Sequence, residues 1–79
     1  MTLILYTRSD CRTCPQVKAA LTKRGIAYEE RDADDPANMA AMKAKGITSV
    51  PALVKGRHKP YVGYSPAGLD EWLRKVGVT

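Results

Sequence analysis

The sequence lacks most of the features that mark a secreted or membrane protein. Only two of its 79 residues are cysteines, whereas small secreted scaffolds usually carry four or more to staple an undersized core. No apolar run reaches the roughly 18 residues that a membrane span requires. Residues 1–6 have neither the charged start nor the long apolar segment of a signal peptide, and they read as a strand. We therefore expect a cytoplasmic location and no membrane partner.

The sequence also lacks a concentrated block of charge. Lys and Arg number 13 against 8 Asp and Glu, which gives a formal net charge of +5. The basic residues are scattered, with no tight cluster of five or more, and no aromatic-rich strand accompanies them. Net charge bears on association and not on fold. We expect solvated faces with a bias towards acidic partners, and no binding of nucleic acid.

Four short segments have the character of strands. No linker, repeat or low-complexity stretch divides the chain, so we expect a single domain over residues 1–79. Apolar, β-branched and aromatic residues favour strands. The segments are residues 2–6, which suit burial on both faces, and residues 26–31 with Tyr28 as anchor, 52–55 and 59–62.

Three helices complete the predicted domain. The first begins at Cys14, the second follows the Asp35 cap, and the third follows Ser65. Apolar residues at helical spacing predict their buried faces. Met39 and Met42 supply that of the second helix, and the third has the stripe Leu69, Trp72, Leu73 and Val76. The order is therefore β-α-β-α-β-β-α. A right-handed crossover makes the first two strands parallel, and a short link makes the last two an antiparallel hairpin. This is an α/β fold with a four-stranded mixed sheet and three helices.

The two cysteines lie where the first helix begins, in the order Cys11-Arg12-Thr13-Cys14. A structural disulfide explains them poorly, because so small a loop hardly constrains the unfolded chain. A Cys-x-x-Cys pair beside a β-α-β pattern is typical of a thioredoxin-like redox motif. Unpaired N–H groups and the helix dipole stabilise a thiolate at Cys11. Cys14 lies about one turn further on, so one cysteine can attack a disulfide and the other can resolve it.

Charged neighbours act on this pair in both directions. Arg8 and Arg12 are expected to lower the pKa of the Cys11 thiol, whereas Asp10 opposes them. We expect a net lowering of the pKa, because the helix terminus acts in the same direction as the arginines. Zinc normally takes four ligands, and the chain offers only the two cysteines and His58, which we expect in an exposed turn. No bound metal or cofactor is predicted beyond the redox-active disulfide.

Val50-Pro51 forms a second candidate element, at the start of the third predicted strand. Proline cannot donate a ladder hydrogen bond. A cis peptide bond would turn the backbone of Val50 towards the cysteines, where an incoming peptide could dock as an extra strand. A trans proline that simply begins the strand is the equal alternative on spacing alone.

Taken together, these residues resemble the glutaredoxin-like redoxins of the thioredoxin superfamily. They are most similar to the NrdH-redoxins, which pass electrons to ribonucleotide reductase. The resemblance rests on Arg8, on Cys11 with Cys14, and on the run Ser49-Val50-Pro51. It implies a thioredoxin fold, a cis Pro51, Cys11 as nucleophile and Cys14 as resolving cysteine. It also implies a reductant, which is thioredoxin reductase for NrdH-redoxins and glutathione for ordinary glutaredoxins.

The segment before the last helix favours the NrdH type. Glutaredoxins carry a Gly-Gly turn and then an acidic residue that help to hold glutathione, whereas here Gly63 is followed by Tyr64 and no acid occurs until Asp70. The glycine, the following aromatic and the proline of the NrdH-redoxin run survive, with Pro66 as the proline. The sequence therefore predicts a monomeric dithiol–disulfide oxidoreductase that reduces ribonucleotide reductase or another disulfide protein and is recharged by thioredoxin reductase. A glutathione-dependent glutaredoxin and a non-enzymatic iron–sulfur or metal carrier on the same fold are the alternatives. The predicted docking residues are Arg8, Arg12, Val50, Pro51, Gly63 and Tyr64.

Overall fold

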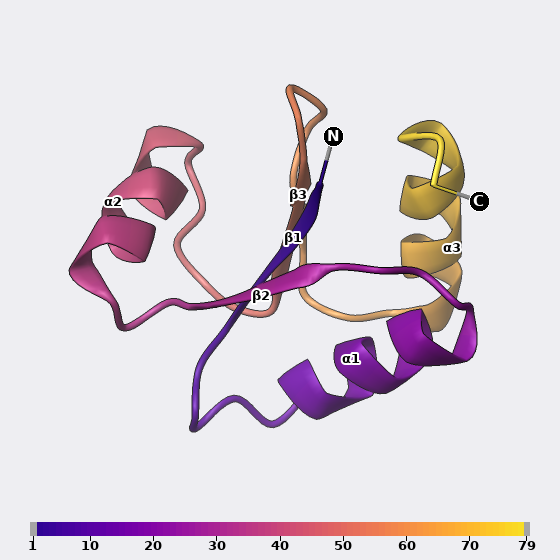
Figure 1. The fold of residues 1–79 in the computed structure, drawn as a ribbon, viewed down its shortest axis with the longest axis horizontal. Helices are drawn as coiled ribbons and strands as arrows, with labels where there is room; N and C mark the ends of the chain where they lie inside the picture. The colour runs from indigo at the N-terminus through magenta and orange to yellow at the C-terminus, as the bar shows by residue number, and fades with distance from the viewer. Residues whose placement is uncertain (1, 79) are drawn as a thin grey trace.

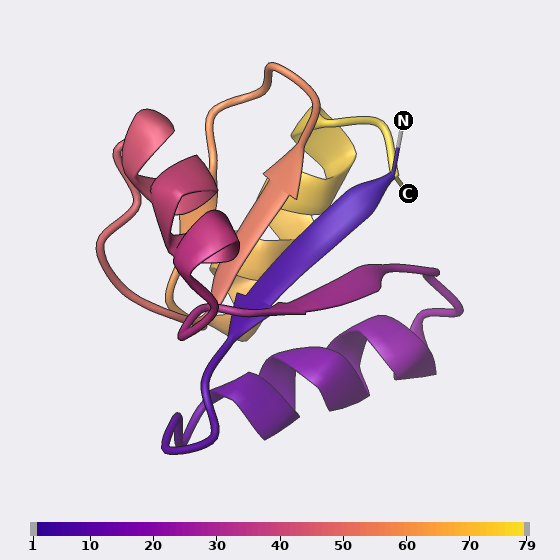
Figure 2. The same ribbon diagram turned by 60° about the vertical axis from the view of Figure 1, so that its left-hand side comes forward.

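A four-stranded mixed sheet forms the centre of the computed structural model, which describes residues 2–78. Its strands lie in the order β2-β1-β3-β4 (Figures 1 and 2). β1 pairs in parallel with β2, and β3 pairs antiparallel with β4, both as predicted. β1 also pairs antiparallel with β3, which joins the two halves of the sheet. Their bounds are β1 (Leu3–Thr7), β2 (Glu29–Asp32), β3 (Ala52–Lys55) and β4 (Tyr61–Val62).

Three helices cover the two faces of the sheet, with α1 and α3 on one face and α2 on the other (Figure 1). Two of them begin at the predicted side-chain caps. The Asp35 carboxylate accepts a hydrogen bond from the N–H of Ala37 at 2.9 Å, and the Ser65 hydroxyl accepts one from the N–H of Gly68 at 3.4 Å. A proline follows each cap, where its missing N–H costs nothing. The bounds are α1 (Cys14–Lys23), α2 (Pro36–Ala44) and α3 (Pro66–Lys75).

The sheet separates two apolar clusters. The larger lies under α1 and α3 and includes the fully buried Leu21, Leu69 and Leu73. The smaller lies under α2 and contains Tyr6 and Met42. β1 contributes to both clusters, so it is buried on both faces, as its continuous apolar sequence predicts. No helix within residues 2–78 is long and apolar enough to cross a membrane.

The strand boundaries differ from the predicted ones. β1 is shifted by one residue from the predicted 2–6, and β4 contains only Tyr61–Val62. β2 begins three residues after the predicted start, because Ile26 donates its N–H to the carbonyl of Leu21 at 3.0 Å as the chain leaves α1. Pairing with β1 therefore starts only at Glu29, opposite Ile4. Tyr28 precedes β2 and packs, half-buried, against the larger cluster.

The prediction of an inward Met39 is wrong. Its side chain is 37% exposed, whereas Met42 is 5% exposed. α2 is short, and residues outside the helix, Ala33 and Ile47, complete the smaller cluster around Met42. One methionine is therefore enough to anchor this helix. Of the single domain predicted over residues 1–79, positions 1 and 79 lie outside the described residues.

Candidate redox-active site

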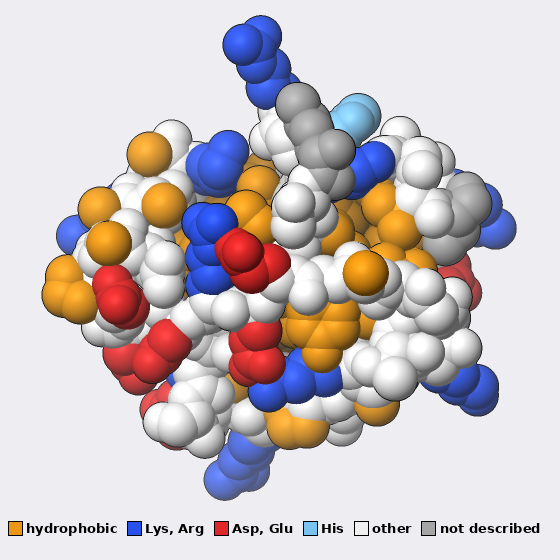
Figure 3. Space-filling model, viewed as in Figure 1, with side chains coloured by type: hydrophobic (Ala, Val, Ile, Leu, Met, Phe, Trp, Pro, Cys, Tyr) orange, Lys and Arg blue, Asp and Glu red, His pale blue; other side chains and the backbone are white. Residues whose placement is uncertain are grey.

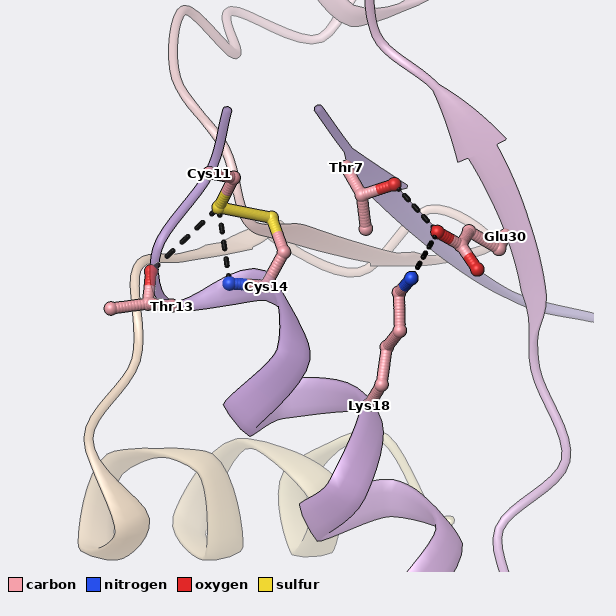
Figure 4. Close-up of a disulfide and its surroundings, with 6 residues drawn as sticks. All are labelled: Thr7, Cys11, Thr13, Cys14, Lys18 and Glu30. Atoms are coloured by element: carbon pink, nitrogen blue, oxygen red, sulfur yellow. Dashed lines mark hydrogen bonds and ion pairs between the residues drawn. A yellow bond between two sulfur atoms is a disulfide. The ribbon is translucent and has the colours of Figure 1, made fainter. Parts of the chain in front are cut away.

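The two cysteines form a disulfide at the junction between the loop after β1 and the start of α1 (Figure 4). Their Cα atoms are 5.5 Å apart. Cys14 is the first residue of α1 and is only 2% exposed, whereas Cys11 lies in the loop and is half-buried. An external disulfide can therefore approach Cys11 more easily than Cys14.

A backbone N–H and a side-chain hydroxyl at the helix start face the sulfur of Cys11. The N–H of Cys14 points to the Cys11 Sγ at 3.1 Å, and the Thr13 Oγ1 lies 3.9 Å from the same sulfur. The N–H of Cys11 donates to the carbonyl of Arg8 at 3.2 Å, which fixes the loop. The first turn of α1 holds no acidic residue. An N–H group at the positive end of a helix dipole stabilises a thiolate on the sulfur that it faces.

The Val50-Pro51 peptide bond is cis, as the family resemblance implies. β3 starts at Ala52, which lies opposite Tyr6 near the end of β1, so Val50 and Pro51 lie at the same end of the sheet as the disulfide loop. Pro51 is buried, and its carbonyl accepts a hydrogen bond from the N–H of Gly63 at 2.8 Å. Within residues 2–78, the N–H and C=O of Val50 take part in no backbone hydrogen bond. Both groups are thus free to pair with an incoming extended peptide.

The two arginines beside the disulfide differ in their surroundings. The Arg8 guanidinium pairs with the carboxylate of Asp34, with Nε 3.1 Å from Oδ1. That carboxylate offsets much of the positive charge that Arg8 was expected to supply to Cys11. Arg12 is exposed and forms no ion pair within the described residues. Arg12 is therefore the cation beside the cysteines whose charge stays uncompensated.

Tyr64 lies on the opposite side of the site from Arg8. It lines an open groove of about 710 Å³ between α1 and α3, with Gln16 and Asp70 among the other lining residues. Asp70 is engaged there by Arg24, with Nη2 and Nε at 2.7 Å and 2.8 Å from Oδ1. Arg8 faces α2 through Asp34, on the other face of the sheet. The predicted docking residues therefore flank the disulfide from both faces.

A polar network beside the disulfide was not predicted from the sequence. The buried hydroxyl of Thr7 donates to Glu30 Oε2 at 2.8 Å, and Lys18 Nζ lies 2.7 Å from the same oxygen (Figure 4). The Lys18 ammonium, followed by the Thr7 hydroxyl, lowers the pKa of Glu30, and the bond to Glu30 raises the pKa of Lys18. Lys18 stands four residues after Cys14, on the same side of α1. This spacing was the only sequence signal, since Glu30 comes from another strand.

Metal-ligating side chains do not gather in the described part of the chain. No group of three or more His, Cys, Asp and Glu that could hold a metal ion occurs within residues 2–78. His58 is exposed in the turn after β3, as predicted. β3 begins beside the disulfide and runs away from it, so His58 lies far from the two cysteines.

Comparisons with known proteins find similar chains of this size. A family model described as Glutaredoxin matches residues 3–59. The chain is 41% identical over 71 residues to the Gene 56 protein of Mycobacterium phage L5, which covers 87% of this chain and 69% of that protein. It is 33% identical over 57 residues to the glutaredoxin-like protein NrdH of Escherichia coli K12, covering 71% of this chain and 70% of that protein.

A solved structure also shows similarity to NrdH. The NrdH-redoxin of Escherichia coli, described by its thioredoxin-like activity profile, matches with a TM-score of 0.77 and 29% identity. The match covers 90% of this chain and 93% of that chain. The matched region of the family model contains both cysteines and Val50-Pro51.

Proposed function

The chain belongs to the glutaredoxin family and is a thiol–disulfide oxidoreductase similar to NrdH, and from this premise we propose that it is an electron donor to ribonucleotide reductase, recharged by thioredoxin reductase. The observation that carries the proposal is the Cys11–Cys14 disulfide at the start of α1, with the N–H of Cys14 directed at the Cys11 sulfur. The resemblance to NrdH, which extends over most of the chain, supports the choice of partners.

The two cysteines take different roles in the proposed reaction. In the reduced protein, the Cys11 thiolate attacks one sulfur of the acceptor disulfide, and the other acceptor sulfur leaves as a thiolate. The Cys14 thiol then loses its proton and attacks the Cys11 sulfur of the mixed disulfide. The Cys11–Cys14 bond forms, the second acceptor sulfur leaves, and two electrons have passed to the acceptor. The greater exposure of Cys11 supports its role as the attacking residue.

Docking of the acceptor involves the backbone of Val50. Its unpaired N–H and C=O form hydrogen bonds with an extended acceptor segment, which lies beside the disulfide along residues 50–51. The hydrogen bond between Gly63 and Pro51 holds this segment in place. Arg8, Arg12 and Tyr64 provide contacts on either side. The protein acts as a monomer, and it needs no bound cofactor because its disulfide is the redox group. It acts in the cytoplasm, where a reducing environment keeps thiols available.

The surroundings of Asp70 favour thioredoxin reductase over glutathione as the reductant. Asp70 is the first acidic residue of the last helix, where glutaredoxins hold glutathione with an acid that follows a Gly-Gly turn. Here its carboxylate is occupied by two contacts with Arg24. A Tyr64 side chain stands where the second glycine would be. Both differences act against a glutathione site and support a protein reductant.

A coupled reduction assay tests the choice of reductant. Insulin disulfides are offered with thioredoxin reductase and NADPH, or with glutathione, glutathione reductase and NADPH, and NADPH oxidation is followed. We expect turnover in the first system and little in the second. Turnover with glutathione alone would assign the protein to the glutathione-dependent glutaredoxins. Ribonucleotide reductase with thioredoxin reductase as the only electron source then tests the acceptor.

Single serine variants test the two cysteine roles. Cys11→Ser should abolish insulin reduction, because no nucleophile remains on the exposed side of the pair. Cys14→Ser should retain the attacking thiol and accumulate a mixed disulfide with the acceptor, visible on a non-reducing gel and in an intact mass. Full dithiol activity of Cys14→Ser would contradict the assignment of roles.

A further inference from the structure

The end of the sheet farthest from the disulfide carries a concentration of positive charge. β3 runs from Ala52 beside the redox site to Lys55, opposite Leu3, so the turn at residues 56–60 lies at the far end. Figures 1 and 2 show that the C-terminal ends of α2 and α3 lie at this same end. We call it the basic end, and it comprises Lys43, Lys45, Lys55, Arg57, Lys59, Arg74 and Lys75.

Most of these cations have no acidic partner. The sequence contains no Asp or Glu at residues 36–69. Lys75 pairs with Glu71 at 3.1 Å, and Lys55 donates to the carbonyl of Val76 at 2.8 Å. The other five cations of the basic end form no ion pair within residues 2–78. In Figure 3, the upper edge of the visible face, where the turn projects, shows Lys, Arg and His side chains and no acidic one.

Helix termini explain only part of this pattern. Cations in the last turn of a helix interact favourably with the helix dipole, which accounts for Lys43, Arg74 and Lys75. Arg57 and Lys59 are exposed in a turn between two strands, where no helix dipole favours them. Uncompensated like charges repel one another and destabilise the compact state. A bound polyanion would relieve that repulsion.

From this arrangement we infer that the basic end is a second docking surface, and that its occupant is an acidic segment of a partner protein. Binding of single-stranded nucleic acid relies on aromatic side chains that stack with the bases. The large apolar side chains exposed within residues 2–78 are Met39 and Val62, and neither is aromatic. Carboxylates of a flexible acidic segment are well suited to such a surface.

The position of the basic end gives the contact a role. Because β3 separates it from the disulfide, a partner held there leaves Cys11 and Val50 accessible. The protein can thus stay attached to one acidic protein while its dithiol reacts with another. This inference does not depend on which acceptor or reductase the redox site uses.

Fluorescence anisotropy of a labelled peptide tests the inference. The probe is a (Glu-Glu-Gly-Ser)-repeat peptide of four units, titrated with the oxidised full chain at about 0.01 M and about 0.15 M NaCl, where the Debye length falls from about 30 Å to about 8 Å. We expect saturable binding that weakens at the higher salt concentration. Arg57→Glu and Lys45→Glu should each lower the affinity about threefold to fivefold, as expected for loss of one exposed charge contact.

Lys23→Glu is the matched control for these variants. Lys23 is exposed and without an ion pair in the described residues, and it lies in the groove between α1 and α3, not in the turn at residues 56–60 or at the ends of α2 and α3. The control changes the net charge equally and should bind the peptide like the unmodified chain. Circular dichroism and insulin reduction establish that all three variants remain folded and active.

Three outcomes would overturn the inference. One is the absence of peptide binding even at low salt. Another is an equal loss of affinity in Lys23→Glu, which would show that net charge alone accounts for peptide binding. The third is tighter binding of a labelled DNA duplex of equal charge with the same dependence on Arg57 and Lys45, which would assign the surface to nucleic acid. Failure of insulin reduction by the unmodified chain would instead contradict the proposed function and leave peptide binding to be judged by itself.

Discussion

Replacing Thr7 by valine would remove one oxygen from the network beside the disulfide while keeping the shape of the side chain. The Thr7 hydroxyl is buried and donates to Glu30 at 2.8 Å. A hydrogen bond to a charged group contributes about 1.5–3 kcal/mol to stability. The Glu30 side chain is 41% exposed, so water replaces part of the lost contact. We therefore expect Thr7→Val to lower the free energy of unfolding near pH 7 by about 1 kcal/mol, which is below that range.

The effect of this substitution should depend on pH. Lys18 and Thr7 lower the pKa of Glu30 in the folded protein. A carboxyl with a lowered folded pKa contributes stability above its unfolded value of about 4.3. That contribution disappears as the pH falls through the folded pKa. The difference between Thr7→Val and the unmodified chain should therefore shrink from near pH 7 to near pH 3.

Guanidinium unfolding followed by tryptophan fluorescence measures this difference. The chain has a single tryptophan, Trp72, which is 8% exposed and donates its indole N–H to the carbonyl of Lys59 at 2.7 Å. In thermal unfolding, the same loss of about 1 kcal/mol should lower the Tm by about 4–8 °C in a domain of this size. Thr22→Val, at an exposed position of α1, is the matched control and should have little effect. Equal stability of Thr7→Val near pH 7, or an undiminished difference near pH 3, would refute the reasoning.

Two further pairs of variants separate the supports of the fold from those of the site. Leu73→Ala should lower the free energy of unfolding by about 2–5 kcal/mol in chemical denaturation, because the side chain is fully buried. Met39→Ala should lower it by less than about 1 kcal/mol, because Met39 is partly exposed. Equal losses of stability would contradict the burial pattern. Gly63→Ala should lower stability by about 1 kcal/mol or more, since its φ of +95° is unfavourable for alanine, and it should also slow insulin reduction through the bond to Pro51. Gly77→Ala, at a φ of +77°, should be strained to a similar degree but reduce insulin at the normal rate; a similar loss of rate in both would exclude a special role of Gly63.

Much of the fold could be predicted because local signals and burial agree. The stripe Leu69, Trp72, Leu73 and Val76 was read from helical spacing, and all four side chains are buried. The Asp35 cap is confirmed by its hydrogen bond to the N–H of Ala37. Such signals act within a few residues, so a single sequence contains them.

The errors concern features that depend on distant parts of the chain. The start of β2 is set by pairing with Ile4 in β1 and not by the apolar Ile26 and Tyr28. The exposure of Met39 follows from how loop residues fill the space below α2. Spacing predicted the cysteine pair, while the cis form of Val50-Pro51 came from the family resemblance alone.

The ion pair of Arg8 and the network around Glu30 illustrate the same limit within the site. Arg8 meets Asp34 only because the start of α2 returns to the end of β1. Glu30 meets Lys18 only because the crossover brings β2 beside α1. The sequence indicated which residues were charged, but the pairs that compensate one another follow from tertiary structure.

The bond between Gly63 and Pro51 uses only backbone atoms. It therefore survives the exchange of side chains at neighbouring positions, provided that glycine remains at 63. Tyr64 next to it projects into the groove between α1 and α3 and takes no part in that bond. Evolution can thus alter the surface beside the disulfide one substitution at a time while the catalytic geometry is inherited intact.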